Sequence, residues 1–64
     1  MKITFFKDGK QIHEEEDNEC NAQIPQAGDH VVIASKGLAI KVKVGRVQWN
    51  YPMVGCPHVW VYLF

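Results

Sequence analysis

Alternating apolar and polar residues predict β-strands along most of this chain. Residues 3–6 (Ile-Thr-Phe-Phe) and 11–13 (Gln-Ile-His) flank an Asp8-Gly9 pair. Such a pair supplies the positive φ angles that a tight hairpin turn needs. We therefore predict a hairpin of two short strands at the start of the chain.

A second group of strand signals lies between two turns. Residues 24–29 (Ile-Pro-Gln-Ala-Gly-Asp) form a turn cluster, and residues 30–34 (His-Val-Val-Ile-Ala) are rich in β-branched side chains. Ser35-Lys36-Gly37 follows as another tight turn signal. Because β-branched residues favour extended backbone, residues 30–34 are predicted to form a strand.

Residues 38–51 have the pattern of one long strand with a change of phase at Gly45. The apolar residues have even numbers before Gly45 and odd numbers after it: Leu38, Ile40, Val42 and Val44, then Val47, Trp49 and Tyr51. One face stays buried across such a change only if the strand gains a residue, as in a β-bulge, which glycine often marks. We therefore predict a bulge near Gly45 that bends the strand and lets a short sheet curl.

The last segment, residues 59–64 (Val-Trp-Val-Tyr-Leu-Phe), is apolar on both faces and follows a turn cluster at residues 52–57. The pattern leaves open which alternate set faces solvent: Trp60, Tyr62 and Phe64, or Val59, Val61 and Leu63. Five strands, short turns and one bent strand favour an all-β fold, either a small antiparallel barrel or an orthogonal sandwich.

Residues 14–23 (Glu-Glu-Glu-Asp-Asn-Glu-Cys-Asn-Ala-Gln) interrupt the strand pattern. They show no apolar periodicity, and their acidic side chains repel one another, so we predict an exposed acidic loop.

Length and charge restrict the functions open to the chain. Its 64 residues allow one small domain, residues 1–64, with little room for a multi-layer enzyme. Seven basic and seven acidic residues cancel, which removes the simplest argument for a polyanion-binding protein. The charges are nevertheless separated: residues 1–35 have three lysines against seven acidic residues, a net charge of −4, and residues 36–64 have four basic residues and no acid. This separation suggests a dipolar surface.

The sequence shows neither a secretory leader nor an apolar run long enough to cross a bilayer. We therefore expect a cytoplasmic protein whose two cysteines, Cys20 and Cys56, are reduced. A structural bridge between these cysteines is the less favoured alternative, and it requires their Cα atoms to lie within about 7 Å of each other.

Three stretches of the chain resemble the small SH3-like barrels. They are Ile24-Pro25-x-x-Gly28-Asp29-x-Val31-Val32-Ile33, then Val44-Gly45-Arg46-Val47-x-Trp49, then the terminal Val59-Trp60-Val61-Tyr62-Leu63. That group includes KOW-type and Tudor-like modules and many tiny barrels of phages and mobile elements, and the likeness covers residues 24–64. It implies a single five-stranded antiparallel SH3-like β-barrel that acts as a binding module, such as a phage or mobile-element accessory protein that inhibits or modulates a host factor.

Neither a metal site nor a catalytic site is favoured. Zinc needs four convergent ligands, usually in close pairs. The candidates are spread along the chain, and only Cys56-Pro57-His58 brings two of them together: His13, Cys20, His30, Cys56 and His58. A Cys–His dyad at Cys56 and His58 lacks an evident orienting group. We expect no cofactor and no enzymatic activity.

Two binding functions remain, and the sequence favours the first. A protein partner would contact the acidic segment and the C-terminal aromatic residues: Glu14, Glu15, Glu16, Asp17, Glu19, Trp60, Tyr62 and Phe64. Residues 59–64 are also a candidate homodimer seam, with a bare strand edge or an apolar patch. The alternative is nucleic-acid binding by a stripe in which Lys41, Lys43 and Arg46 contact phosphates, with Gln48 and Asn50 on the same face.

Overall fold

The computed structural model describes residues 1–16, 23–35 and 37–64, and within them it contains five β-strands and no helix. The strands are β1 (Lys2–Lys7), β2 (Lys10–Glu16), β3 (His30–Ser35), β4 (Leu38–Asn50) and β5 (His58–Leu63). The described part of the chain therefore offers no helix that could cross a membrane.

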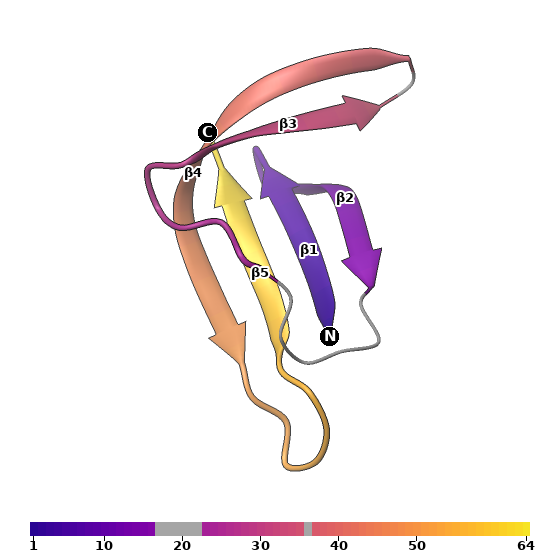
Figure 1. Ribbon diagram of the computed structural model, residues 1–64, viewed down its shortest axis with the longest axis vertical. Coiled ribbons are helices and arrows are strands. Elements are labelled where there is room, and N and C mark those ends of the chain that lie inside the picture. Colours follow the sequence, from indigo (N-terminus) through magenta and orange to yellow (C-terminus); the bar gives the residue numbers. More distant parts are fainter. Residues whose placement is uncertain (17–22, 36) are drawn as a thin grey trace.

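The five strands form one curled sheet in the order β2-β1-β5-β4-β3 (Figure 1). Three neighbouring pairs are antiparallel, but β1 and β5 run parallel to each other. The all-β class with five strands is confirmed, whereas the prediction of a purely antiparallel sheet is wrong. Local turn signals fix the direction only of strands joined by a tight turn, and β1 and β5 lie at opposite ends of the sequence.

The N-terminal hairpin is confirmed, and it is longer than predicted. Asp8 and Gly9 have φ angles of 54° and 77°, as a two-residue hairpin turn requires. The acidic residues Glu14–Glu16, however, belong to β2 and pair with residues 2–4 of β1. The prediction of a loop is wrong for these three residues because a strand at the edge of a sheet needs backbone partners on one side only and tolerates exposed charge.

The predicted bulge in β4 is confirmed at Gly45. Val44 lies opposite Leu63 and Arg46 lies opposite Tyr62, so Gly45 is the extra residue. β4 bends along its length: its first part pairs with β3, and its last part, beyond the bulge, pairs with β5 (Figure 1). The bend carries β3 and the start of β4 across one end of the sheet.

The core lies on one side of the sheet, which we call the inner face; the opposite side is the outer face. The buried apolar residues among those described are Met1, Ile3, Phe5, Ile33, Val42, Val44, Val59, Val61 and Leu63. In β5, Val59 and Val61 are completely buried, so the valine set of residues 59–64 faces inward. Because side chains alternate along a strand, Trp60 and Tyr62 are directed to the outer face.

The apolar pattern of β4 overestimates the core. Leu38 is 70% exposed, and Ile40 is exposed as well, although both share the even-numbered register of the buried Val42 and Val44. These two residues lie further than Val42 from the part of β4 that pairs with β5. Past the bulge, Val47 packs against the core, while Trp49 and Tyr51 remain exposed.

The structure also bears on the last strand and on Cys56. β5 lies between β1 and β4, so it does not have the bare edge that strand pairing with another chain would need. A homodimer seam formed by the apolar side chains of residues 59–64 stays a prediction. Cys56 is half-buried against the core and is disulfide-bonded, so the expectation of a reduced thiol is wrong at this residue. Cys20 lies outside the described residues.

Candidate binding surface

Three neighbouring strands bring aromatic residues together on the outer face. Phe6 of β1 lies beside Tyr62 of β5, and Arg46 of β4 lies on the other side of Tyr62. Trp60 is two residues from Tyr62 along β5 and so shares its face. We call these four residues, Phe6, Arg46, Trp60 and Tyr62, the aromatic face.

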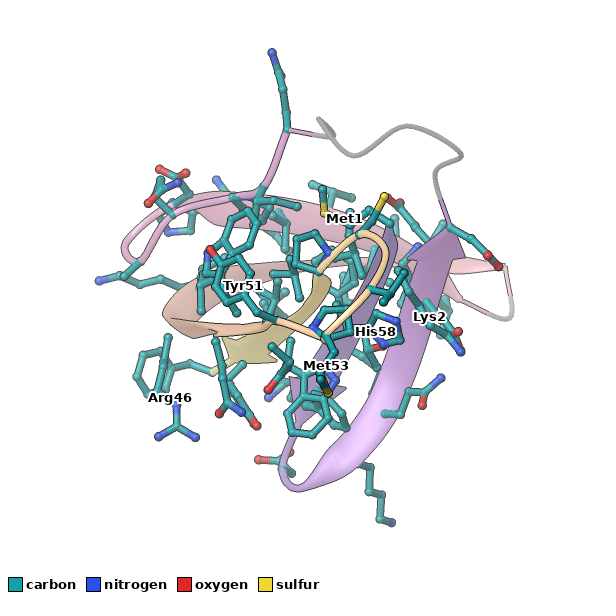
Figure 2. All side chains as sticks on the ribbon, turned by 90° about the horizontal axis from the view of Figure 1, so that it is seen from below. Met1, Lys2, Arg46, Tyr51, Met53 and His58 are labelled. Carbon is teal, nitrogen blue, oxygen red and sulfur yellow. The ribbon has the colours of Figure 1, made fainter. Side chains whose placement is uncertain are left out.

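The side chains of the aromatic face contact one another. The ring centroids of Phe6 and Tyr62 are 5.4 Å apart with nearly parallel planes, and those of Phe6 and Trp60 are 5.8 Å apart in an edge-to-face arrangement. The Arg46 guanidinium carbon lies 4.3 Å from the Tyr62 ring centroid, within cation–π range. Figure 2 shows Arg46 projecting from the opposite side of the sheet to Met1 and Tyr51.

These contacts give the surface a fixed shape while leaving part of it open to solvent. Trp60 is 37% exposed, and Phe6 and Tyr62 are half-buried. Rings that pack edge-to-face or offset against one another gain about 0.5–1.5 kcal/mol per pair beyond their burial, which restricts their rotamers. The aromatic face is therefore preorganised for a partner that covers it.

Polar side chains frame the aromatic face on both sides. On β4, the Gln48 side-chain amide donates to the Asn50 side-chain oxygen at 2.9 Å, and the Asn50 amide donates to the His58 carbonyl at 3.3 Å. On the β1–β2 side, the Lys2 ammonium lies 2.8 Å from a Glu14 carboxylate oxygen. This layout, with aromatic residues and arginine at the centre and hydrogen-bonding groups around them, resembles the core and rim of a protein interface.

The acidic residues predicted to bind a protein are divided between the two faces. Glu14 and Glu16 pair with Thr4 and Lys2 on the outer face, at the edge beside the aromatic face. Glu15 points to the inner face, where a carboxylate oxygen lies 3.1 Å from the His13 ring nitrogen. Asp17 and Glu19 lie outside the described residues.

The predicted basic stripe is also divided. Lys41 and Lys43 are exposed on the side of β4 opposite Val42 and Val44, in the part of the strand that pairs with β3. Arg46 follows the bulge and instead contacts the aromatic residue Tyr62. The structure thus joins Arg46, assigned to the nucleic-acid alternative, with Trp60 and Tyr62, assigned to protein binding.

Phe6 is not among the binding residues that the sequence predicts, and Phe64 lies outside the aromatic face. Phe6 is adjacent to the buried Phe5 in the sequence, and only the pairing of β1 with β5 shows that it faces Tyr62. Phe64 is exposed beyond the end of β5, and its ring lies against Gly45. The parallel β1–β5 pair, which no local signal encodes, is therefore what creates the aromatic face.

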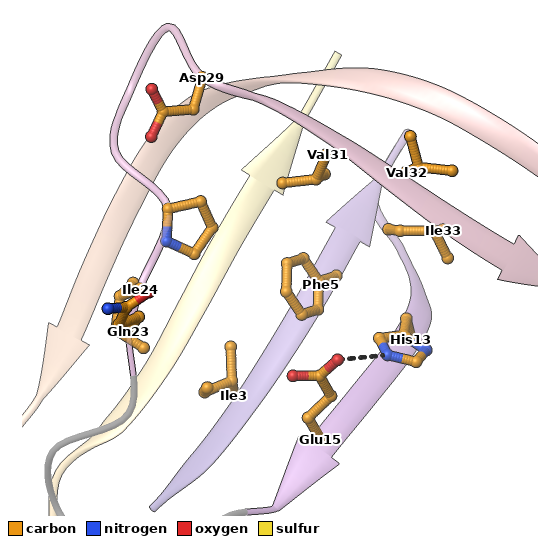
Figure 3. Close-up of a pocket in the computed structure, with 11 residues that line it drawn as sticks. Ile3, Phe5, His13, Glu15, Gln23, Ile24, Asp29, Val31, Val32 and Ile33 are labelled. Atoms are coloured by element: carbon orange, nitrogen blue, oxygen red, sulfur yellow. Dashed lines mark hydrogen bonds and ion pairs between the residues drawn. The ribbon is translucent and has the colours of Figure 1, made fainter.

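A cavity of about 440 Å³ opens on the inner face (Figure 3). Its apolar wall includes Ile3, Phe5 and Ile33, and the His13–Glu15 pair lies at its β2 side. Among the described residues, no three His, Cys, Asp or Glu side chains are grouped so that they could hold a metal ion.

The fold and this surface define a class: a small curled β-sheet protein with an exposed aromatic face. No protein-family model, curated protein or solved structure matches the chain.

Proposed function

We propose that the protein is a non-enzymatic protein-binding module whose binding surface is the aromatic face. The observation that carries this proposal is the cluster in which Arg46 covers the Tyr62 ring while Phe6 contacts both Tyr62 and Trp60. Tryptophan, tyrosine and arginine are the residues most enriched among those that dominate protein–protein binding energy. The partially exposed Trp60 is the central anchor.

The charge around the aromatic face favours a protein over a nucleic acid. Glu14 and Glu16 lie along β2 at one edge of the surface, and Lys2, the nearest basic residue on β1, is engaged with Glu14. A phosphate backbone laid across the four strands from β4 to β2 would approach these carboxylates. A protein partner can instead match a surface that is acidic at one edge and basic at the other.

Nucleic-acid binding is the second candidate, and the contact between Arg46 and Tyr62 supports it. Exposed rings on a sheet can stack the bases of a single strand, and Lys41, Lys43 and Arg46 could contact phosphates. On this alternative, affinity falls steeply with salt because phosphate contacts release counterions.

The first experiment compares two tryptophans with similar exposure on opposite faces. Peptides selected from a random displayed library against the immobilised protein are tested on Trp60→Ala and on Trp49→Ala. Trp49 is 40% exposed and pairs with the inward-facing Val59, whereas Trp60 pairs with Gln48. We expect Trp60→Ala to weaken the selected peptides about tenfold or more and Trp49→Ala to leave their affinity unchanged. Peptides insensitive to Trp60→Ala would contradict the proposal.

The second experiment separates the two candidate functions. Labelled single-stranded DNA and RNA homopolymers are titrated with the protein near physiological salt, and we expect no strong retention. Tight, strongly salt-dependent binding that disappears in the Lys41→Glu/Lys43→Glu double variant would support the nucleic-acid function and count against the protein-binding one.

Three narrower expectations remain proposals. Membership of the SH3-like barrels rests on the quoted sequence stretches, and the parallel β1–β5 pair sets this sheet apart from an antiparallel barrel. A phage or mobile-element accessory role rests on the same resemblance. A cytoplasmic location is weakened by the disulfide at Cys56, because such bonds persist mainly in oxidising compartments.

A further inference from the structure

β3 is one of the two edge strands of the sheet, and its far side pairs with no other described strand. The Val44 N–H donates to the Asp29 carbonyl at 2.8 Å, so Val44 directs its backbone groups toward the β3 side. The direction of the backbone N–H and C=O groups alternates from residue to residue along a strand. Val42 and its partner Val31 therefore also point these groups toward each other. By the same alternation, three residues of β3 present N–H and C=O groups to the open side: His30, Val32 and Ala34.

The two edges of the sheet differ in how they are protected. β2 has Lys10 and three glutamates, and its pairing with β1 is irregular between Phe5 and Phe6. Charged residues and irregular register are the usual means of preventing a strand from pairing with another chain. β3 (His-Val-Val-Ile-Ala-Ser) has no Lys, Arg, Asp, Glu or Pro, its register with β4 is regular, and Val32 is 66% exposed.

We propose that β3 is a self-association edge that pairs antiparallel with β3 of a second copy of this chain. In the register that pairs all three of these residues and keeps the inner faces of both copies on one side, Val32 lies opposite Val32 of the second copy and His30 lies opposite Ala34. These are the residues whose backbone groups point outward, so each of these pairs exchanges two hydrogen bonds. The two five-stranded sheets then form one continuous sheet related by a two-fold axis.

Charge does not prevent a second copy from pairing at this edge. The strand itself places no like charges opposite each other. Lys41, the neighbour of Val32 on β4, is separated from Lys41 of the second copy by three strand spacings, about 14 Å. That distance exceeds the screening length of about 8–10 Å near physiological salt, so the lysines oppose pairing only weakly.

The proposed dimer would also change how the aromatic face is presented to a partner. A two-fold axis perpendicular to the sheet keeps the outer faces of both copies on the same side, so the two aromatic faces would be presented together. A partner with two docking segments could then bind with higher avidity than either face provides alone. The self-association itself does not depend on the aromatic face having a partner.

The first test measures association by sedimentation velocity over a hundredfold range of protein concentration. We expect reversible dimerisation of the native chain and its loss in Val32→Lys, because two lysines would meet at the two-fold axis. Leu38→Lys is the matched control: it adds the same charge to the same hairpin, at an exposed position on β4. A native chain that stays monomeric, a Val32→Lys variant that dimerises normally, or a loss of dimer in both variants would each overturn the proposal.

The second test identifies the register. In the proposed dimer the Val32 Cα atoms of the two copies are about 5.5 Å apart, within the range that a disulfide spans. Val32→Cys should therefore form a cross-linked dimer on mild oxidation. Ala34→Cys, exposed on the same strand, should not, since its two copies are offset by about 13 Å. Cross-linking of both variants, or of neither, would refute this register.

Discussion

At the scale of single residues, Gly45 shows how one position serves both the backbone and the packing. It is the extra residue of the β4 bulge, and a Cβ atom placed there would lie 2.7 Å from Cε2 and 2.9 Å from Cζ of the Phe64 ring. The sequence predicted the bulge from the change of phase in the apolar pattern. It could not predict the contact with Phe64, which depends on the pairing of β4 with β5.

We expect Gly45→Ala to displace the Phe64 ring and to cost about 0.5–1.5 kcal/mol, since Phe64 is 74% exposed and its ring can move. In a Phe64→Ala background the same substitution should cost less, because no ring remains to clash. Urea unfolding of the two single variants and the double variant measures this coupling.

Gly55 provides the control for Gly45. Gly55→Ala is costly through its positive φ of 96° and not through a neighbour, because no atom lies within 4 Å of its added Cβ. Its cost should therefore be the same with and without the Phe64 ring. If Gly45→Ala costs the same in the native chain and in the Phe64→Ala variant, the contact with the Phe64 ring is not the reason that a glycine is needed at position 45.

At the scale of elements, β4 shows what an apolar pattern determines and what it leaves undetermined. The even-numbered apolar residues of its first part all share one face, as the sequence predicts. Only Val42 and Val44 are buried, because they lie at or next to the end of β5, whereas Leu38 and Ile40 lie further along β4 from it. Burial depends on where the strand ends relative to its neighbours, and local periodicity does not encode that distance.

The difference in burial along β4 should appear in the free energy of unfolding. Val44 is 1% exposed, and we expect Val44→Ala to destabilise the protein by about 1.5–3 kcal/mol, through lost burial and the cavity left behind. Leu38→Ala removes a larger apolar group from the same strand and should change stability by less than about 0.5 kcal/mol. Urea midpoints of the two variants check this order, and similar losses would place Leu38 in a buried contact.

The edge strand β2 shows where apolar periodicity fails to detect a strand. The acidic residues Glu14–Glu16 were predicted to form a loop because they have no apolar periodicity, yet they extend β2 by pairing with β1. Periodicity detects strands with a buried face, and it misses an edge strand whose side chains are mostly solvated. The aromatic face was missed for a related reason, since its members come from strands that become neighbours only through the sheet order.

At the scale of the whole molecule, the described core is small and lies on one side of a single sheet. A chain of this length buries only about 60% of the surface that its unfolded form exposes, so its net stability is small. Small domains often gain the remaining stability from a covalent cross-link. The disulfide at Cys56, half-buried against the core, fits that need.

The disulfide leads to a prediction about the native chain. Cys20 is the only other cysteine in the sequence, so an intramolecular bond of Cys56 would enclose about 36 residues, the difference between positions 56 and 20. Restricting a loop of that length in the unfolded chain is worth about 2–4 kcal/mol. We expect a reducing agent to lower the urea midpoint by a corresponding amount. Cys56→Ala should lower the midpoint equally, and the midpoint of this variant should not respond to the reductant.

Cys20→Ala should match Cys56→Ala, because either change removes the same bond. A native chain with an unchanged midpoint under reduction would show that packing alone holds the fold, and it would remove the objection that this disulfide raises to a reducing compartment.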